Sequence, residues 1–184
     1  MSRIGKMPVS IPEAVSVEVN GLSIKISGAK GTLSKSFAGG INIKHQDNQI
    51  LVSLNDEENS TKFDKAMHGT ARNIIANMLK GVSEGFTISL NLSGIGYKAA
   101  VIENGINLNY GYSHLIKFFV REKDRALVKI SVPKPDNIIV SSPDKELVGL
   151  YASQLKNIRR FNVYKGKGIS VTGEKIILKK RKKA

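Results

Sequence analysis

The most restrictive feature of this sequence is a pattern that occurs twice. The segment DKAMHG begins at Asp64, and the similar segment DKELVG begins at Asp144, 80 residues later. Asn77 and Asn157 match at the same offset. Each segment lies near the start of a stretch with helical periodicity, and each stretch follows several short runs typical of strands. We therefore predict one structural unit that is used twice, with chance similarity between two helix starts as the alternative.

The first predicted helix extends from about Thr61 to Lys80. Ser60 or Thr61 can cap its amino-terminal end, and Gly81 is typical of a helix carboxyl end. Its apolar residues recur at steps of three and four, so they form one face of the helix. These residues are Phe63, Met67, Ala71, Ile74 and Met78.

The second predicted helix extends from about Pro143 to Phe161. Ser142 is the expected cap, and Pro143 suits the first helical position because its missing N–H has no partner there in any case. The apolar face of this helix consists of Leu147, Leu150, Tyr151, Leu155 and Ile158.

Hairpin signals precede both helices. Asn20-Gly21 lies between the runs VSVEV and LSIKI, and Asn104-Gly105 lies between KAAVIE and INLNY. An Asn-Gly pair between alternating runs favours a tight antiparallel turn. Neither helix connects two obvious parallel strands, so the sequence predicts an α+β fold with two similar domains, each an antiparallel β-sheet with one main helix packed on a face. We place these domains at residues 1–82 and 83–184.

The composition limits the kind of protein this chain can be. Its 184 residues include no cysteine, which excludes disulfides, thiolate catalysis and cysteine-based zinc sites. The sequence contains no run of about 18 apolar residues that would predict a transmembrane helix, and its first residues lack the apolar core of a signal peptide. We therefore expect a soluble cytoplasmic protein.

The net charge of +14 is concentrated at one end of the chain. Residues 1–82 contain 10 basic and 7 acidic residues, and residues 83–153 contain 8 and 7. Residues 154–184 contain 11 basic residues and one acidic residue. This distribution indicates an anionic partner, which is a nucleic acid, an acidic membrane surface or an acidic protein.

The strongest candidate site is this basic carboxyl-terminal region. Lys and Arg side chains neutralise phosphates, glycines let the backbone approach a surface closely, and a tyrosine can stack on a base or anchor a loop in the core. The candidate residues are Lys156, Arg159, Arg160, Tyr164, Lys165, Gly166, Lys167, Gly168, Lys175, Lys179, Lys180 and Arg181. The sequence shows no base-reading recognition helix, so we predict contact with the shape and phosphates of a folded RNA. A frayed solubility tail is the alternative interpretation.

Other motifs favour other functions less well. GIGYKA (Gly94–Ala99) matches a dinucleotide fingerprint, but a strand follows it where a helix is required, so a bend in a strand is the simpler interpretation. GAKG (Gly28–Gly31) matches the loop of an RNA-binding KH domain, but it lies between strand-like runs, so a turn is expected. His45, His68 and His114 have no ligand spacing or triad context. We therefore predict no cofactor, metal site or catalytic residue.

The chain as a whole resembles one protein family, the bacterial large-subunit ribosomal protein six. The resemblance rests on YKGKGI followed by GE near the carboxyl end, SRIGKMPVSIP at the amino end, HGTARNIIANMLKGVSEGF, GIGYKA and GYSH. Three features depart from the family pattern. Residues 160–163 replace prolines and an acid, Lys156 stands where arginine is usual, and Leu115 follows GYSH where proline is usual.

The resemblance implies two similar α+β domains in a structural ribosomal component that is not an enzyme and has no small-molecule substrate. It implies binding to large-subunit ribosomal RNA through the second domain, near the sarcin–ricin loop and the base of the factor-binding stalk, with neighbouring large-subunit proteins as further partners. The nearly neutral first domain is expected to contact protein or to act as a spacer. The contact residues implied are Lys156, Arg159, Tyr164, Lys165, Gly166, Lys167 and Gly168.

Two other functions remain as alternatives. One is a nucleotide-dependent enzyme that uses Gly94–Ala99. The other is a membrane-surface protein held by the terminal lysines, for which the tail lacks an amphipathic apolar face.

Overall fold

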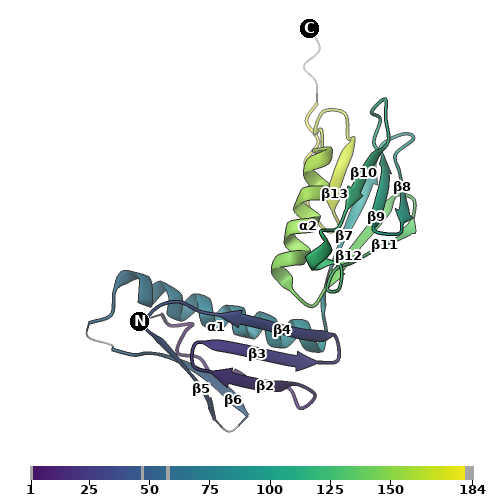
Figure 1. Cartoon of the computed structure of the whole chain (residues 1–184). Helices are drawn as coiled ribbons and strands as arrows, with labels where there is room; N and C mark the ends of the chain where they lie inside the picture. Colours follow the sequence, from purple (N-terminus) through teal and green to yellow (C-terminus); the bar gives the residue numbers. More distant parts are fainter. Residues whose placement is uncertain (1, 47, 57–58, 181–184) are drawn as a thin grey trace. The chain divides into compact units, whose positions relative to one another are not determined.

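The computed structural model describes residues 2–46, 48–56 and 59–180 (Figure 1). The chain divides into two compact units. The first is Met1–Gly85 with Pro143–Lys145, and the second is Phe86–Ser142 with Glu146–Ala184. Each unit contains antiparallel strands and one main helix, which confirms the predicted α+β fold class.

The first unit distributes its described strands between two small sheets. The strands are β1 (Val9–Ser10), β2 (Ser16–Asn20), β3 (Ser23–Gly28), β4 (Gly31–Ser36), β5 (Ile41–Gln46) and β6 (Gln49–Leu54), and the helix is α1 (Lys62–Ser83). One sheet has the order β2-β3-β4, and the other has the order β1-β6-β5. Helix α1 contacts strands of both sheets, so the core of this unit lies between the helix and the strands.

Helix α1 begins as predicted and ends at Ser83, three residues beyond the predicted last residue Lys80. The Thr61 hydroxyl accepts a hydrogen bond from the Asp64 N–H, and the Asp64 carboxylate accepts one from the Thr61 N–H, which forms a capping box. The predicted end at Gly81 is wrong because Gly81 is buried inside the helix, and Gly85, with a φ of 82°, follows the cap residue instead.

The buried face of α1 is also rotated from the predicted one. Phe63 is 57% exposed, whereas His68 is almost fully buried and its Nε2 lies 2.9 Å from the Val52 carbonyl oxygen. The buried residues of the helix are His68, Ala71, Ile75, Met78, Leu79, Gly81 and Val82. His68 is thus a packing residue of the core of the first unit.

Among the described residues, the second unit contains the same set of elements with one more strand and a short 3-10 helix. Its elements are β7 (Phe86–Ser93), β8 (Lys98–Ile102), β9 (Gly105–Asn109), β10 (Ile116–Phe119), the short 3-10 helix η1 (Glu122–Asp124), β11 (Lys129–Lys134), β12 (Asn137–Ser142), α2 (Lys145–Ile158) and β13 (Gly168–Val171). One sheet has the order β10-β9-β8, and the other has the order β11-β12-β7-β13. Residues of both sheets and of α2 form one apolar core.

The strand orders reveal the internal repeat directly. The sheet β2-β3-β4 of the first unit corresponds to β8-β9-β10 of the second, and β5-β6-β1 corresponds to β11-β12-β7. In both units the helix follows the strand that is central to the second sheet, β6 or β12. Strand β13 has no counterpart among the described residues of the first unit, so the second unit is the repeat with an added edge strand.

Helix α2 starts later and ends earlier than the sequence indicated. Ser142 is the last residue of β12, where it pairs with Phe86, so the chain is still extended at the predicted cap. The helix therefore begins at Lys145 and ends at Ile158. Its buried residues are Val148, Tyr151, Ala152 and Leu155, whereas the predicted face residue Leu150 is 39% exposed.

Candidate nucleic-acid interface

The basic carboxyl-terminal region begins as a folded part of the second unit. Strand β13 pairs with β7 and places Gly168 opposite Ser93. A bridge between Arg160 and Ile169 joins the segment after α2 to β13, and a bridge between Asn162 and Lys167 closes the connection from α2 to β13 on itself. The connection between them, Asn162–Gly168, is called the basic loop here. Pairing at both of its ends fixes the loop on the edge of the sheet.

Hydrogen bonds inside the basic loop fix its backbone. The Asn162 side-chain oxygen accepts hydrogen bonds from the N–H groups of Tyr164 and Lys165, at 2.9 and 3.1 Å. The Asn162 N–H donates to the Lys167 carbonyl at 2.8 Å, and the Gly166 N–H donates to the Asn162 carbonyl at 2.8 Å. Gly166 has a φ of 65°, a conformation that glycine adopts without strain. The exposed side chains of Lys165, Lys167 and Tyr164 therefore project from a fixed loop.

Gly168 is the point where this loop comes closest to the end of α2. It is buried, has a φ of 144°, and a Cβ placed on it would lie 2.9 Å from the Arg160 carbonyl oxygen and overlap the Cα of Phe161. No side chain fits in this space. A glycine is thus required for the basic loop to reach the sheet.

Lys156 differs from the other predicted contact residues because it already has an anionic partner. Its Nζ lies 2.6 and 2.8 Å from the two carboxylate oxygens of Glu174, the single acidic residue of residues 154–184. Glu174 also accepts a hydrogen bond from the Val171 N–H at 3.1 Å. The Lys156 hydrogen bond, followed by that from Val171, holds the pKa of Glu174 below its ordinary value of 4.5. A phosphate would have to compete with this carboxylate for Lys156.

We expect this ion pair to give the segment after β13 a dependence on pH. Because the pKa of Glu174 is lowered in the folded chain, its stabilising contribution is complete above 4.5 and is lost as the pH falls through the lower folded value. The Val171 amide should therefore exchange faster with solvent as the pH falls below 4.5, after correction for the intrinsic exchange rate. Hydrogen exchange followed by NMR would measure this, with Glu174→Gln as the control. The interpretation fails if the Gln variant retains the same dependence on pH.

The remaining predicted residues have different surroundings. Arg160 is exposed and its Nε donates to the Asn157 side-chain oxygen at 3.3 Å. Lys175, Lys179 and Lys180 are exposed, and the Lys179 N–H donates to the carbonyl of a basic-loop residue at 3.1 Å. Arg181 lies outside the described residues.

A group of planar side chains lies at the end of α2 and consists of Arg159, which was predicted as part of the site, with Tyr112 and His114, which were not. The Arg159 guanidinium carbon is 4.9 Å from the centre of the Tyr112 ring, and the Tyr112 hydroxyl donates to the Ile158 carbonyl at 3.1 Å. The His114 ring lies 6.2 Å from the Tyr112 ring, at an interplanar angle of 29°. The hydroxyl of Tyr112, and after it that of Tyr97, raises the pKa of Arg159, so the guanidinium stays charged. The sequence signal for this group was the segment GYSH, which places Tyr112 and His114 two residues apart in a chain with only 6% Phe, Trp and Tyr.

The glycine motifs that suggested other functions are turns. Gly96 has a φ of 78°, and strand β8 follows it directly, so no helix opens at GIGYKA. Gly28 and Gly31 pair with each other across the tight turn between β3 and β4, which excludes the KH-type loop. Both interpretations as turns or bends are therefore confirmed.

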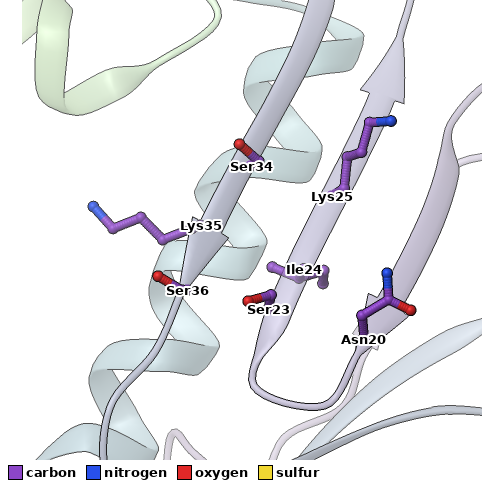
Figure 2. Close-up of a pocket in the computed structure, with 7 residues that line it drawn as sticks. All are labelled: Asn20, Ser23, Ile24, Lys25, Ser34, Lys35 and Ser36. Atoms are coloured by element: carbon purple, nitrogen blue, oxygen red, sulfur yellow. The ribbon is translucent and has the colours of Figure 1, made fainter.

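A further concave surface lies on the first unit. A shallow pocket of about 300 Å³ lies on the sheet β2-β3-β4 of the first unit (Figure 2). Its lining contains hydroxyls, amide, lysine and isoleucine side chains but no acidic or histidine side chain, namely Asn20, Ser23, Ile24, Lys25, Ser34, Lys35 and Ser36. Within the described ranges, no three acidic or histidine residues are grouped as metal ligands. The described helices are not long and apolar enough to cross a membrane.

Comparison with known proteins gives one consistent result. The sequence profile of the family described as Ribosomal protein L6 matches residues 11–85 and 93–172. A large ribosomal subunit protein uL6 from Mycoplasmopsis pulmonis is 43% identical over 184 residues, which is 100% of this chain and 99% of that protein. Proteins of the same name from Thermoanaerobacter sp. (strain X514) and Chlorobium limicola are 43% and 39% identical, over 99% and 100% of this chain and 98% and 99% of their own length. The two matched segments correspond to the two copies of the repeated unit.

Proposed function

We propose that this chain, which belongs to the ribosomal protein L6 family, is a structural constituent of the large ribosomal subunit. It would bind large-subunit ribosomal RNA through its second unit. As a member of this family it is a structural protein and not an enzyme. Its place would then be on cytoplasmic ribosomes, with ribosomal RNA and neighbouring ribosomal proteins as partners and a role in translation.

The observation that carries this proposal is the fixed basic loop. A solubility tail needs charge but no defined geometry, whereas Lys165 and Lys167 project from a loop whose backbone is held by hydrogen bonds and by pairing to β7. Cations on a fixed glycine-containing loop can contact phosphates without reading the bases. RNA is favoured over DNA because neither of the described helices, α1 and α2, carries a pattern of base-reading side chains for a major groove.

The predicted contact residues have different roles within this proposal. Arg159, Arg160, Lys165 and Lys167, with Lys175, Lys179 and Lys180, supply the positive charge, and Tyr164 supplies an exposed ring. Gly166 and Gly168 shape the loop. Lys156 acts first as the partner of Glu174, so its contribution to RNA affinity should be smaller than that of either loop lysine. Arg181 would extend the basic surface.

The finer location and the role of the first unit belong to the same proposal. The second unit would contact RNA near the sarcin–ricin loop and the base of the factor-binding stalk. Residues 1–82 and 83–184 would be separate domains, and the nearly neutral first domain would contact protein or act as a spacer. Chemical footprinting of the RNA with and without the protein would test the location. Protection only of nucleotides outside these two regions would contradict it.

The test of RNA binding is a salt series with isolated large-subunit RNA. The double variant Lys165→Ala, Lys167→Ala should bind more weakly, and the slope of log affinity against log salt should become shallower by about 1.4 to 1.8, because each phosphate contact contributes roughly 0.7 to 0.9. The matched control is Lys117→Ala, Lys129→Ala, which removes the same charge from exposed positions on β10 and β11. Equal slopes for both double variants would contradict a direct phosphate contact by the loop. Absence of RNA binding by the unchanged protein would contradict the proposed function itself.

A further inference from the structure

We propose that Tyr112, His114 and Arg159 form a stacking site for one unpaired nucleobase of the bound RNA. The proposal rests on the proposed function and adds to it, because the basic loop contacts phosphates whereas this group would contact a base. The sequence assigned no ligand to Tyr112 or His114, and it assigned Arg159 only a phosphate contact. The contacts that follow carry the assignment.

The side chains of Tyr112 and Arg159 already hold each other in place in the chain without RNA. The Tyr112 ring is held from two directions, by the hydrogen bond from its hydroxyl to the Ile158 carbonyl and by the Arg159 guanidinium 4.9 Å from its centre. Gly111 has a φ of 74°, and a Cβ placed on it would lie 3.3 Å from the buried Tyr97 ring. The loop that carries Tyr112 therefore rests on the core. A ligand that stacks here would pay little conformational entropy for ordering the site.

The three side chains have the chemistry of a stacking surface for a base. Aromatic rings and guanidinium groups are the surfaces on which proteins stack splayed-out RNA bases. Tyr112 is 40% exposed, and His114 is exposed on the same loop with its ring nearly parallel to that of Tyr112. A charged Arg159 beside an aromatic ring favours a flat, polarisable ligand. An aliphatic protein side chain would form weaker stacking and cation–π interactions with these rings and the guanidinium than a nucleobase would.

The stacking group lies next to the basic loop in the second unit. Arg159 follows the last residue of α2 directly, and the basic loop begins three residues later at Asn162. The Arg159 carbonyl also accepts a hydrogen bond from the Ile169 N–H at 3.1 Å, which ties the residue beneath the ring to the strand that carries the loop. One RNA segment thus meets phosphate ligands and a stacking surface at the same end of the second unit. The base must be unpaired, because paired bases in a helix do not present their faces.

The experiment compares His114→Ala and Tyr112→Leu with the unchanged chain in the same salt series on isolated large-subunit RNA. Loss of a stacked base should lower affinity roughly tenfold at every salt concentration and leave the slope unchanged, since no phosphate contact is removed. His114→Phe keeps a ring and should restore most of the affinity. Leu115→Ala is the matched control, because Leu115 is exposed on the same loop but lies outside the stack.

A second readout tests the contact itself. Irradiation of the complex with ultraviolet light, followed by digestion and mass spectrometry, should yield a nucleotide attached to the peptide that contains Tyr112 and His114. Unchanged affinity in the His114 and Tyr112 variants, with a shallower slope in the Lys165, Lys167 variant, would overturn the stacking site and leave the proposed function intact. A crosslink from this peptide to a protein in the assembled subunit would assign the surface to a protein partner and also overturn it. A change of slope in the His114 variant would show an electrostatic effect in place of stacking.

Discussion

Replacing Gly105 with alanine is expected to destabilise the second unit strongly while the stability of the first unit is unchanged. Gly105 is the first residue of β9 and pairs with Phe119 of β10. A Cβ placed on it would overlap the carbonyl oxygen of Phe118 and lie 2.9 Å from the carbonyl carbon. These are backbone atoms, which cannot rotate away as a side chain can, so the two strands must separate. We expect the free energy of unfolding of this unit to fall by about 3 kcal/mol, at the upper end of the cost of overpacking.

Hydrogen exchange of the full-length chain would measure this effect separately in each unit. Amides of the second unit should exchange roughly a hundredfold faster, and amides of the first unit should be unchanged. Gly149→Ala is the control, because a Cβ at Gly149 meets no atom within 4 Å and alanine is the better helix former. It should stabilise the chain by about 0.8 kcal/mol. Equal acceleration in both units of the Gly105 variant would contradict the proposal that residues 1–82 and 83–184 are separate domains.

The second large effect is expected from Gly168→Ala, which should release the basic loop from the sheet. Two costs combine at this position. Its φ of 144° lies in a region that only glycine adopts readily, and a Cβ there would overlap the backbone of Phe161. We expect a loss of about 3 kcal/mol in the free energy of unfolding, together with a loss of RNA affinity as large as that of the Lys165, Lys167 double variant. Urea denaturation and RNA binding at low temperature would measure the two effects.

A second glycine separates the two costs. Gly173 has a φ of 87°, but a Cβ on it would meet no atom within 4 Å. Gly173→Ala should therefore suffer backbone strain alone, about 1 kcal/mol, and should keep its RNA affinity. If both variants lose the same stability, the close approach of Gly168 to Phe161 is not what holds the loop.

The hairpins illustrate how a sequence signal can be right for a partly different reason. Gly21 has a φ of 60° and is the first of two turn residues between Asn20 and Ser23, as a turn glycine should be. Gly105 lies after its turn and has no positive φ, and it is glycine because β10 passes too close for a side chain. The pattern located both hairpins. Only the tertiary contact explains the second glycine.

The errors at the ends and faces of the helices have a similar origin. Capping at Thr61 was predictable because it involves residues three positions apart. Ser142 was assigned as a cap by the same rule, but its pairing with Phe86 keeps it in β12. Local signals define what a residue can do, and pairing between distant strands selects among these possibilities.

The candidate site was predictable where it is local and not where distant segments meet. Asn162–Gly168 was recognisable from its lysines and glycines because they are adjacent in sequence. The ion pair of Lys156 with Glu174 and the contact of Arg159 with Tyr112 join residues 18 and 47 positions apart. Opposite charges and aromatic rings are common along any chain, so composition does not indicate which of them will meet.

The position of β13 bears on how a repeated architecture acquires a partner. The first unit builds its core from β1 to β6 and α1, so one copy of the repeat is complete without an added strand. In the second unit, β13 occupies the outer edge of β7, where it leaves the shared strand order intact. Lys165 and Lys167, which we propose bind RNA, are exposed on this extension and can change without disturbing the core, whereas Gly168 and Ile169 are buried in it. Duplication thus supplies a stable scaffold, and an unoccupied sheet edge supplies the place where a new specificity is attached.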